Sequence, residues 1–155
     1  MLRLVRRLVA LCLLAGLLAA AGCGGSPARL SKASYLAKSE AVCSKLEADG
    51  HALPDPASPR DLPAYLTAST ALTVTAKAKL DALAARYSDP AYVHRIFLDP
   101  LAAQITALRR IMPRVIAESA KGSTAALDGL ALPQADLEAM GVYGFHECRK
   151  VVGSR

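Results

Sequence analysis

Apolar residues recur at helical spacing along three long stretches of this chain, and that pattern sets the folds open to it. Between residues 61 and 87, Leu, Ala, Val and Tyr return every three or four positions, which places them on one face of a helix. Residues 31–50 repeat the pattern and end at a glycine, while 89–119 begin with an Asp-Pro pair, a cap followed by a first-turn proline. No stretch shows the sustained alternation of a strand. The sequence therefore predicts an all-α fold.

Prolines and glycines mark where these helices are interrupted. Four prolines fall within "HALPDPASPRDLP", which predicts a loop after the first helix. Pro100 falls inside the third apolar face, where the helix either kinks or ends and restarts, and Pro113 raises the same question further on. Near the end of the chain, "PQADLEAMG" predicts one short helix after a glycine-containing loop. The expected architecture is a helical bundle of three long helices plus a short C-terminal helix.

The first 22 residues have the composition of a secretory signal peptide. Three arginines and no acidic residue precede an apolar run from Leu8 to Ala21, and small residues follow it. The run is shorter than the roughly 20 residues that cross a bilayer. An uncleaved anchor helix or a buried core helix is the alternative. We expect a signal-peptide helix over 1–22 that is removed on export.

Cys23 ends the tetrapeptide "AAGC", which resembles the lipobox of bacterial lipoproteins. By that resemblance, Cys23 receives a diacylglyceryl thioether and becomes the mature N-terminus. Two or three acyl chains, such as palmitate, anchor stably where a single chain binds only marginally. "GGSPA" then reads as a flexible tether. We expect a lipidated cysteine and tether over 23–30, a single helical domain over 31–155, and a location on the extracytoplasmic side of the cell membrane.

Cysteine counting predicts one disulfide. Cys12 leaves with the leader and Cys23 is the lipid site, so Cys43 and Cys148 remain. In an exported, oxidising setting two leftover thiols most simply pair with each other. Free thiols are one alternative. A metal site is another, but His146 would add only a third ligand and no CxxC spacing occurs.

Charge and motif content narrow the possible functions. The full chain carries 19 basic and 13 acidic side chains, but three of the basic ones lie in the leader, which leaves a net charge of +3. No basic block with interleaved aromatic residues occurs, so nucleic-acid binding is not expected. The sequence also lacks GxSxG, HExxH, a P-loop and a GxGxxG that opens a helix. We expect no enzyme activity, no cofactor and no metal.

Two short motifs resemble those of small lipoproteins from high-G+C Gram-positive bacteria. In that class, "Y/F-x-x-x-A-x-x-x-C" near the mature start is answered near the end by "YG-x-x-x-C". The corresponding pieces here are "YLAKSEAVC", which ends at Cys43, and "YGFHEC", which ends at Cys148. The resemblance implies an envelope location and a helical architecture, and it implies no activity.

Two groups of residues are candidates for binding. Ser69, Thr73 and Ala76 are small on a helical face where Leu would be expected, which indicates either a close helix crossing or a pocket for a small amphipathic ligand. A cationic group follows helical spacing and forms either a solvated face or a contact for anionic lipid or an acidic partner: Arg110, Arg114 and Lys121. We therefore expect a membrane-anchored binding module. A carrier of a hydrophobic molecule in the bundle interior, or an enzyme or enzyme accessory with scattered polar residues, is the alternative.

Overall fold

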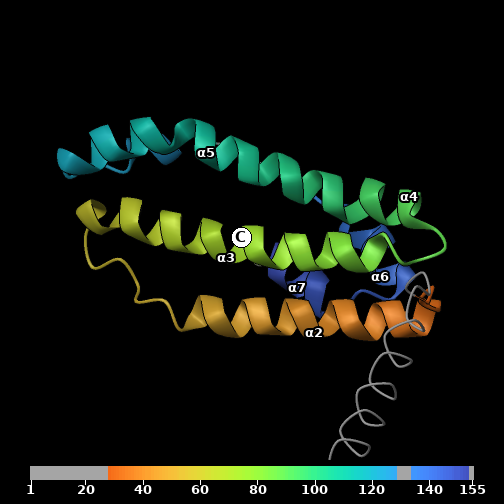
Figure 1. Ribbon diagram of the computed structural model, residues 1–155. Coiled ribbons are helices and arrows are strands. Elements are labelled where there is room, and N and C mark those ends of the chain that lie inside the picture. Colours follow the sequence, from red (N-terminus) through yellow and green to blue (C-terminus); the bar gives the residue numbers. More distant parts are fainter. Residues whose placement is uncertain (1–27, 129–133, 154–155) are drawn as a thin grey trace, which may run out of the picture.

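The computed structural model describes residues 28–128 and 134–153, and every element in them is helical apart from an isolated bridge between Leu30 and Tyr87 (Figure 1). The predicted all-α fold is thus confirmed. The expected signal peptide, the expected lipidation site Cys23 and most of the expected tether lie outside the described residues. The helices are α2 (Lys32–His51), α3 (Leu62–Ala84), α4 (Pro90–Val93), α5 (Asp99–Ala120), α6 (Leu137–Tyr143) and α7 (Glu147–Gly153), with a π-helical turn at His94–Leu98 and 3-10 turns at Pro59–Asp61 and Ala125–Leu127.

The long helices run side by side, with α3 packed against both α2 and α5 (Figure 1). The start of α2, the end of α3 and α4 lie at one end of the bundle. The short helices α6 and α7 pack close to that same half of the molecule. Within the described part of the chain, no helix is both long and apolar enough to cross a membrane.

The third helix continues through Pro100. The carbonyl group that would normally accept a hydrogen bond from residue 100 accepts one from another segment instead. The chain passes from α4 through the π-helical turn into α5, and the Asp99 N–H bonds to the His94 carbonyl five residues back. Pro100 has no N–H to offer the preceding turn. The carbonyl of Ile96, four residues before it, instead accepts a hydrogen bond of 3.1 Å from the Asp136 N–H. A π-helical turn and a distant backbone donor therefore accommodate the proline.

The expectation of a single short C-terminal helix is wrong, because α6 and α7 are separate. Gly144 ends α6 in the left-handed region at φ 113, a conformation that glycine adopts without steric cost. The Phe145 N–H then bonds to the Met140 carbonyl, which completes a Schellman motif. The chain turns there and restarts as α7, which lies in the tail beyond the predicted short helix and is a second C-terminal helix that the sequence pattern did not predict.

The predicted disulfide joins Cys43 of α2 to Cys148 of α7. The Glu40 carboxylate, one helical turn before Cys43, accepts hydrogen bonds from the backbone N–H groups of His146 (3.1 Å) and Glu147 (2.5 Å). These donors belong to the start of α7, where N–H groups have no partner within the helix. A carboxylate there is also favoured by the helix dipole. Glu40 therefore caps α7 from another helix and holds Cys148 beside its partner.

The hydrophobic core is concentrated at the end of the bundle where α2 begins. Its largest fully buried side chains are Tyr35, Phe97, Phe145, Leu80, Leu98 and Met140. Six of the chain's seven aromatic residues form one contact cluster there, namely Tyr35, Tyr87, Tyr92, Phe97, Tyr143 and Phe145. The opposite half of the long helices is filled mainly by Ala, Thr and Ser, which shapes the surface described next.

Candidate functional site

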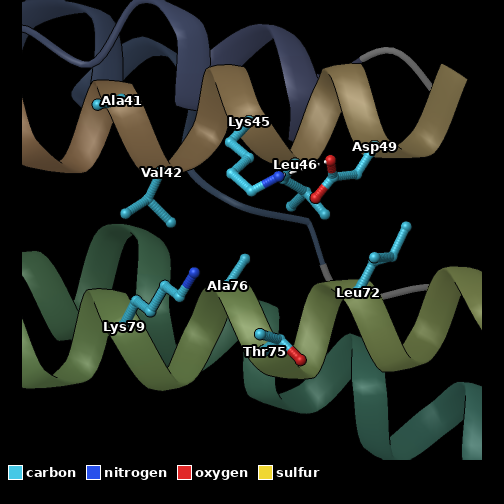
Figure 2. A pocket seen from close by; sticks show the side chains of 9 residues that line it. All are labelled: Ala41, Val42, Lys45, Leu46, Asp49, Leu72, Thr75, Ala76 and Lys79. Atoms are coloured by element: carbon cyan, nitrogen blue, oxygen red, sulfur yellow. Dashed lines mark hydrogen bonds and ion pairs between the residues drawn. The ribbon is translucent and has the colours of Figure 1, made fainter. Parts of the chain in front are cut away.

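A shallow seam lies between α2 and α3 (Figure 2). Its volume of about 180 Å³ is below the range of about 300–1,000 Å³ that ligand pockets usually have. Lys45 and Asp49 form an ion pair of 2.8 Å on the α2 side, so their two charges compensate each other. The seam is lined by Ala41, Val42, Lys45, Leu46, Asp49, Leu72, Thr75, Ala76 and Lys79. It offers little room for a ligand.

A larger groove lies between α3 and α5, and we call it the α3–α5 groove. One hollow of about 570 Å³ is lined by Thr67, Thr70, Ala71, Val74, Thr75, Arg109 and Met112. A second hollow of about 300 Å³ is lined by Val74, Lys77, Ala78, Asp81, Ala102, Ile105, Thr106 and Arg109. Because Val74 and Arg109 belong to both linings, the two hollows adjoin along the same pair of helices. Their combined size suits a small organic molecule.

The walls of the α3–α5 groove are less polar than its threonines suggest. Thr67, Thr75 and Thr106 each donate their hydroxyl to the carbonyl four residues back in their own helix, at 2.6, 2.9 and 2.9 Å. Those bonds turn the polar end of each side chain toward the backbone. Thr70 is buried, and its hydroxyl has no hydrogen-bond partner among the described residues. Methyl groups and the side chains of Val74 and Met112 are therefore available to an apolar ligand.

Arg109 is the uncompensated charge of this groove. Lys77 and Asp81 also line the second hollow, but they pair with each other at 2.8 Å. Arg109 is exposed and has no ion-pair partner in the part of the chain that the structure describes. A guanidinium presents planar donors that match a carboxylate or phosphate. The groove can thus hold a molecule with an apolar body and an acidic group.

The small residues singled out from the sequence lie on another face of α3. Thr73 is buried and donates its hydroxyl to the Ser69 carbonyl at 2.9 Å, while Ala76 is buried and lines the seam toward α2. None of the three lines the α3–α5 groove. Its α3 wall was nevertheless visible in the sequence, because Thr67, Thr70, Ala71 and Val74 follow the spacing i, i+3, i+4, i+7 of one helical face. Which of two small-residue faces stays open depends on helix pairing, which this spacing does not encode.

The predicted cationic group lies at the end of α5 that is farther from the start of α2 (Figure 1). Arg110, Arg114 and Lys121 are all exposed. The Arg114 guanidinium donates to the Ala125 carbonyl at 3.3 Å, and Lys121 pairs with Glu118 at 3.0 Å. Residues 28–128 and 134–153 hold no group of three or more His, Cys, Asp or Glu side chains arranged for a metal ion.

The hydroxyls of Tyr35 and Tyr143 in the aromatic cluster have raised pKa values and stay protonated over the ordinary pH range. Burial raises the pKa of Tyr35 to about 12. Burial also raises the pKa of Tyr143, and so does its hydrogen bond of 2.7 Å to the Tyr87 oxygen. A phenol with a raised pKa is a poor general base. The Tyr143 hydroxyl therefore serves hydrogen bonding, whereas the Tyr35 ring serves packing and its hydroxyl has no hydrogen-bond partner among the described residues.

Comparison with models of protein families, with curated proteins and with solved structures finds no match to this chain. Any functional conclusion must therefore come from the geometry of the chain itself.

Proposed function

We propose that the chain is an exported lipoprotein, anchored to the membrane through Cys23, whose helical domain binds a small amphipathic anion in the α3–α5 groove. The observation that carries the binding proposal is the position of Arg109, which lines both adjoining hollows and has no carboxylate partner among the described residues. An acidic group on Arg109 would leave the apolar part of a ligand lying along Val74 and Met112. Few, well-placed polar groups in an apolar lining are the usual composition of a small-molecule site.

Binding without catalysis is the role that the lining residues favour. The hydroxyls of Thr67, Thr75 and Thr106 are already committed to backbone carbonyls. Asp81, the carboxylate of the second hollow, is committed to Lys77. A nucleophile needs an adjacent base within hydrogen-bond reach, and the lining supplies no such pair. The alternatives of a carrier and of an enzyme accessory stay predictions.

The binding proposal is tested with 8-anilinonaphthalene-1-sulfonate, a fluorescent aromatic anion, and the full lipidated chain in detergent. Arg109→Ala should weaken binding of this probe about fivefold, as expected for about 1 kcal/mol from a partly solvated ion pair. Ala71→Leu should weaken it further by filling the groove. The matched control is Arg110→Ala, which removes the neighbouring exposed arginine outside the groove. Equal effects of the Arg109 and Arg110 changes, with both variants folded, would place the site elsewhere.

The anchor is tested by mass spectrometry of the mature N-terminus. We expect a Cys23 that carries a diacylglyceryl group, and we expect Cys23→Ala to accumulate as precursor or to leave the membrane fraction. An unmodified N-terminus at another position would contradict the lipoprotein proposal and leave the groove proposal standing.

A further inference from the structure

A row of two neighbouring tyrosines with a cation at each end crosses the end of the bundle where the described chain begins. The Lys32 ammonium lies 4.1 Å from the centroid of the Tyr143 ring, and the rings of Tyr143 and Tyr92 are 5.2 Å apart. The Arg95 guanidinium in turn lies 5.2 Å from the centre of the Tyr92 ring. The row joins α2, α6, α4 and the π-helical turn, so residues distant in sequence form one continuous surface. We call it the tether-end row.

The chain that leads from Cys23 is fixed to this same end. The Leu30 N–H donates to the Arg86 carbonyl at 2.7 Å, and the Arg86 guanidinium donates to the Ala28 carbonyl at 3.3 Å. Ala28 is only five positions after Cys23. A fully extended chain covers at most about 3.6 Å per residue, so this tether reaches about 18 Å. If Cys23 is lipidated, this end of the bundle must lie close to the lipid surface.

Exposed apolar surface lies beside the row. Val142, next to Tyr143 on α6, is 83% exposed, which is unusual for a large aliphatic side chain in a folded domain. Tyrosines with an apolar body and a polar tip are enriched at membrane interfaces. Lysine and arginine keep their charge in water while their stems lie along apolar surface. The composition of the row is therefore that of a surface partly embedded among headgroups.

The charged side chains of the row itself, Lys32 and Arg95, are both cationic. The wider end of the bundle is mixed in charge, because it exposes four carboxylates beside Arg29: Asp89, Asp99, Asp136 and Glu138. Lys and Arg near a membrane are attracted by anionic headgroups. The two cations of the row, together with the short tether, point to an anionic lipid surface as the occupant.

We propose that the tether-end row docks onto anionic lipid headgroups and holds the bundle upright on the membrane; this inference rests on the proposed anchor at Cys23. The 22 residues of α5 span about 33 Å at 1.5 Å per residue. Arg110, Arg114 and Lys121 then face away from the anchoring membrane. The first hollow of the α3–α5 groove lies toward that distal end, because Thr67 is near the start of α3 and Met112 is in the second half of α5. The second hollow extends from there toward the tether end. Docking therefore presents the first hollow to the envelope rather than to the lipid.

Tryptophan probes test the orientation, since the chain has no tryptophan of its own. Val142→Trp places a probe beside the row, and Ile116→Trp, at a position 53% exposed, places a matched probe on the distal half. Each full lipidated variant is incorporated into vesicles of brominated phosphatidylcholine with phosphatidylglycerol. Fluorescence of the first probe should be quenched and that of the second should not. Ala91→Trp on α4, also exposed, replaces the first probe if that variant does not fold.

Charge removal tests the role of the cations. Lys32→Gln and Arg95→Gln should each lower the ratio of docked to undocked protein about fivefold, as expected from about 1 kcal/mol per basic residue at an anionic surface. The control pair Arg110→Gln and Arg114→Gln should leave quenching unchanged. Raising the salt concentration should reduce quenching of the probe beside the row, because exposed charges are screened.

The outcomes separate this inference from the proposed anchor. If both probes are quenched equally, the bundle lies flat and the inference is wrong. If neither is quenched while the protein remains on the vesicles and Cys23 carries lipid, the inference is wrong and the anchor stands. If Cys23 carries no lipid and the protein is not retained, the anchor and the docking inference fail together.

Discussion

Breaking the disulfide between Cys43 and Cys148 should remove a large part of the free energy of unfolding. The two cysteines are 105 positions apart, so the bond closes a loop that covers most of the helical domain. In the chain-entropy account, a loop of about 100 residues contributes about 4.7 kcal/mol by restricting the unfolded chain. Domains of this size are stable by about 5–15 kcal/mol in total. Reduction should therefore bring the domain close to the limit of folding.

The expected shift in melting temperature follows from the size of the domain. An unfolding entropy of about 2.1 cal/mol/K per residue gives about 0.26 kcal/mol/K for a domain of roughly 125 residues. A loss of about 4.7 kcal/mol then lowers the melting temperature by about 15–20 °C.

The assay compares the oxidised and phosphine-reduced wild-type chain by urea and thermal unfolding. Reduction leaves both sulfur atoms in the protein. It therefore measures the contribution of the cross-link to stability separately from that of the packed cysteine side chains, which are at most 1% exposed. The double variant Cys43→Ala/Cys148→Ala serves as a second comparison, and its additional loss reports the packing of the sulfur atoms. A difference of less than about 1 kcal/mol between oxidised and reduced wild type would refute the entropic reasoning.

Three further changes probe local features of the fold. Glu40→Ala should lower the free energy of unfolding by about 1–2 kcal/mol, because it removes the cap from the two N–H groups at the start of α7; urea unfolding measures this, and an unchanged midpoint would contradict it. Gly144→Ala should lower the free energy of unfolding by about 1–2 kcal/mol in the same assay, because the left-handed conformation disfavours a Cβ. That Cβ would also lie 3.0 Å from Leu36 Cδ1. The control Gly50→Ala, in open space on α2, should be neutral or stabilising. The free energy of unfolding should fall as the pH rises from about 10 to about 12, because the unfolded chain loses the Tyr35 proton before the folded one does. Tyr35→Phe should make this dependence on pH less steep. An equal dependence in both proteins would show that Tyr35 is not its source.

Local signals in the sequence predicted the long helices well. The expected stretches 31–50, 61–87 and 89–119 correspond to α2, to α3 and the turn after it, and to the run from α4 to α5. Ser31 or Ser34 could cap the first helix by its residue type, and the structure has Ser31 as the cap, with its hydroxyl accepting from the Ser34 N–H at 3.2 Å. Such caps, prolines and periodic faces act within one or two helical turns, so the sequence displays them directly.

Features that depend on helix pairing were not predictable in the same way. The cap that Glu40 supplies to α7 joins residues more than 100 positions apart. The tether-end row consists of residues from four segments, and the spacing of Lys32, Tyr92 and Arg95 in the sequence does not predict that these segments lie together. The disulfide was the exception among long-range contacts, because only two cysteines remained to pair once the leader and the lipid site were set aside. The groove was missed because periodicity defines faces of one helix but does not say which face its neighbours leave open.

The uneven distribution of large side chains predicts that the two halves of the bundle differ in local stability. Among the residues that the structure describes, the continuous cluster of buried core residues contains none between Cys43 and Leu80, and none between Ile105 and Ala135. In the first half of α3 the buried side chains are Thr70 and Thr73, which bring far less apolar area than the aromatic rings at the other end.

Segments with few buried apolar contacts open locally at a lower free energy than the global transition. Backbone amides at 66–75 should therefore exchange faster with deuterium than those at 76–84, although both lie in one helix. Binding of an amphipathic anion in the first hollow of the α3–α5 groove should slow exchange most at 66–75, because a ligand there adds the apolar contacts that this half lacks. Equal protection along the whole of α3 in the free protein would mean that the groove lies over a core as stable as the tether end, and the link between thin packing and ligand binding would be lost.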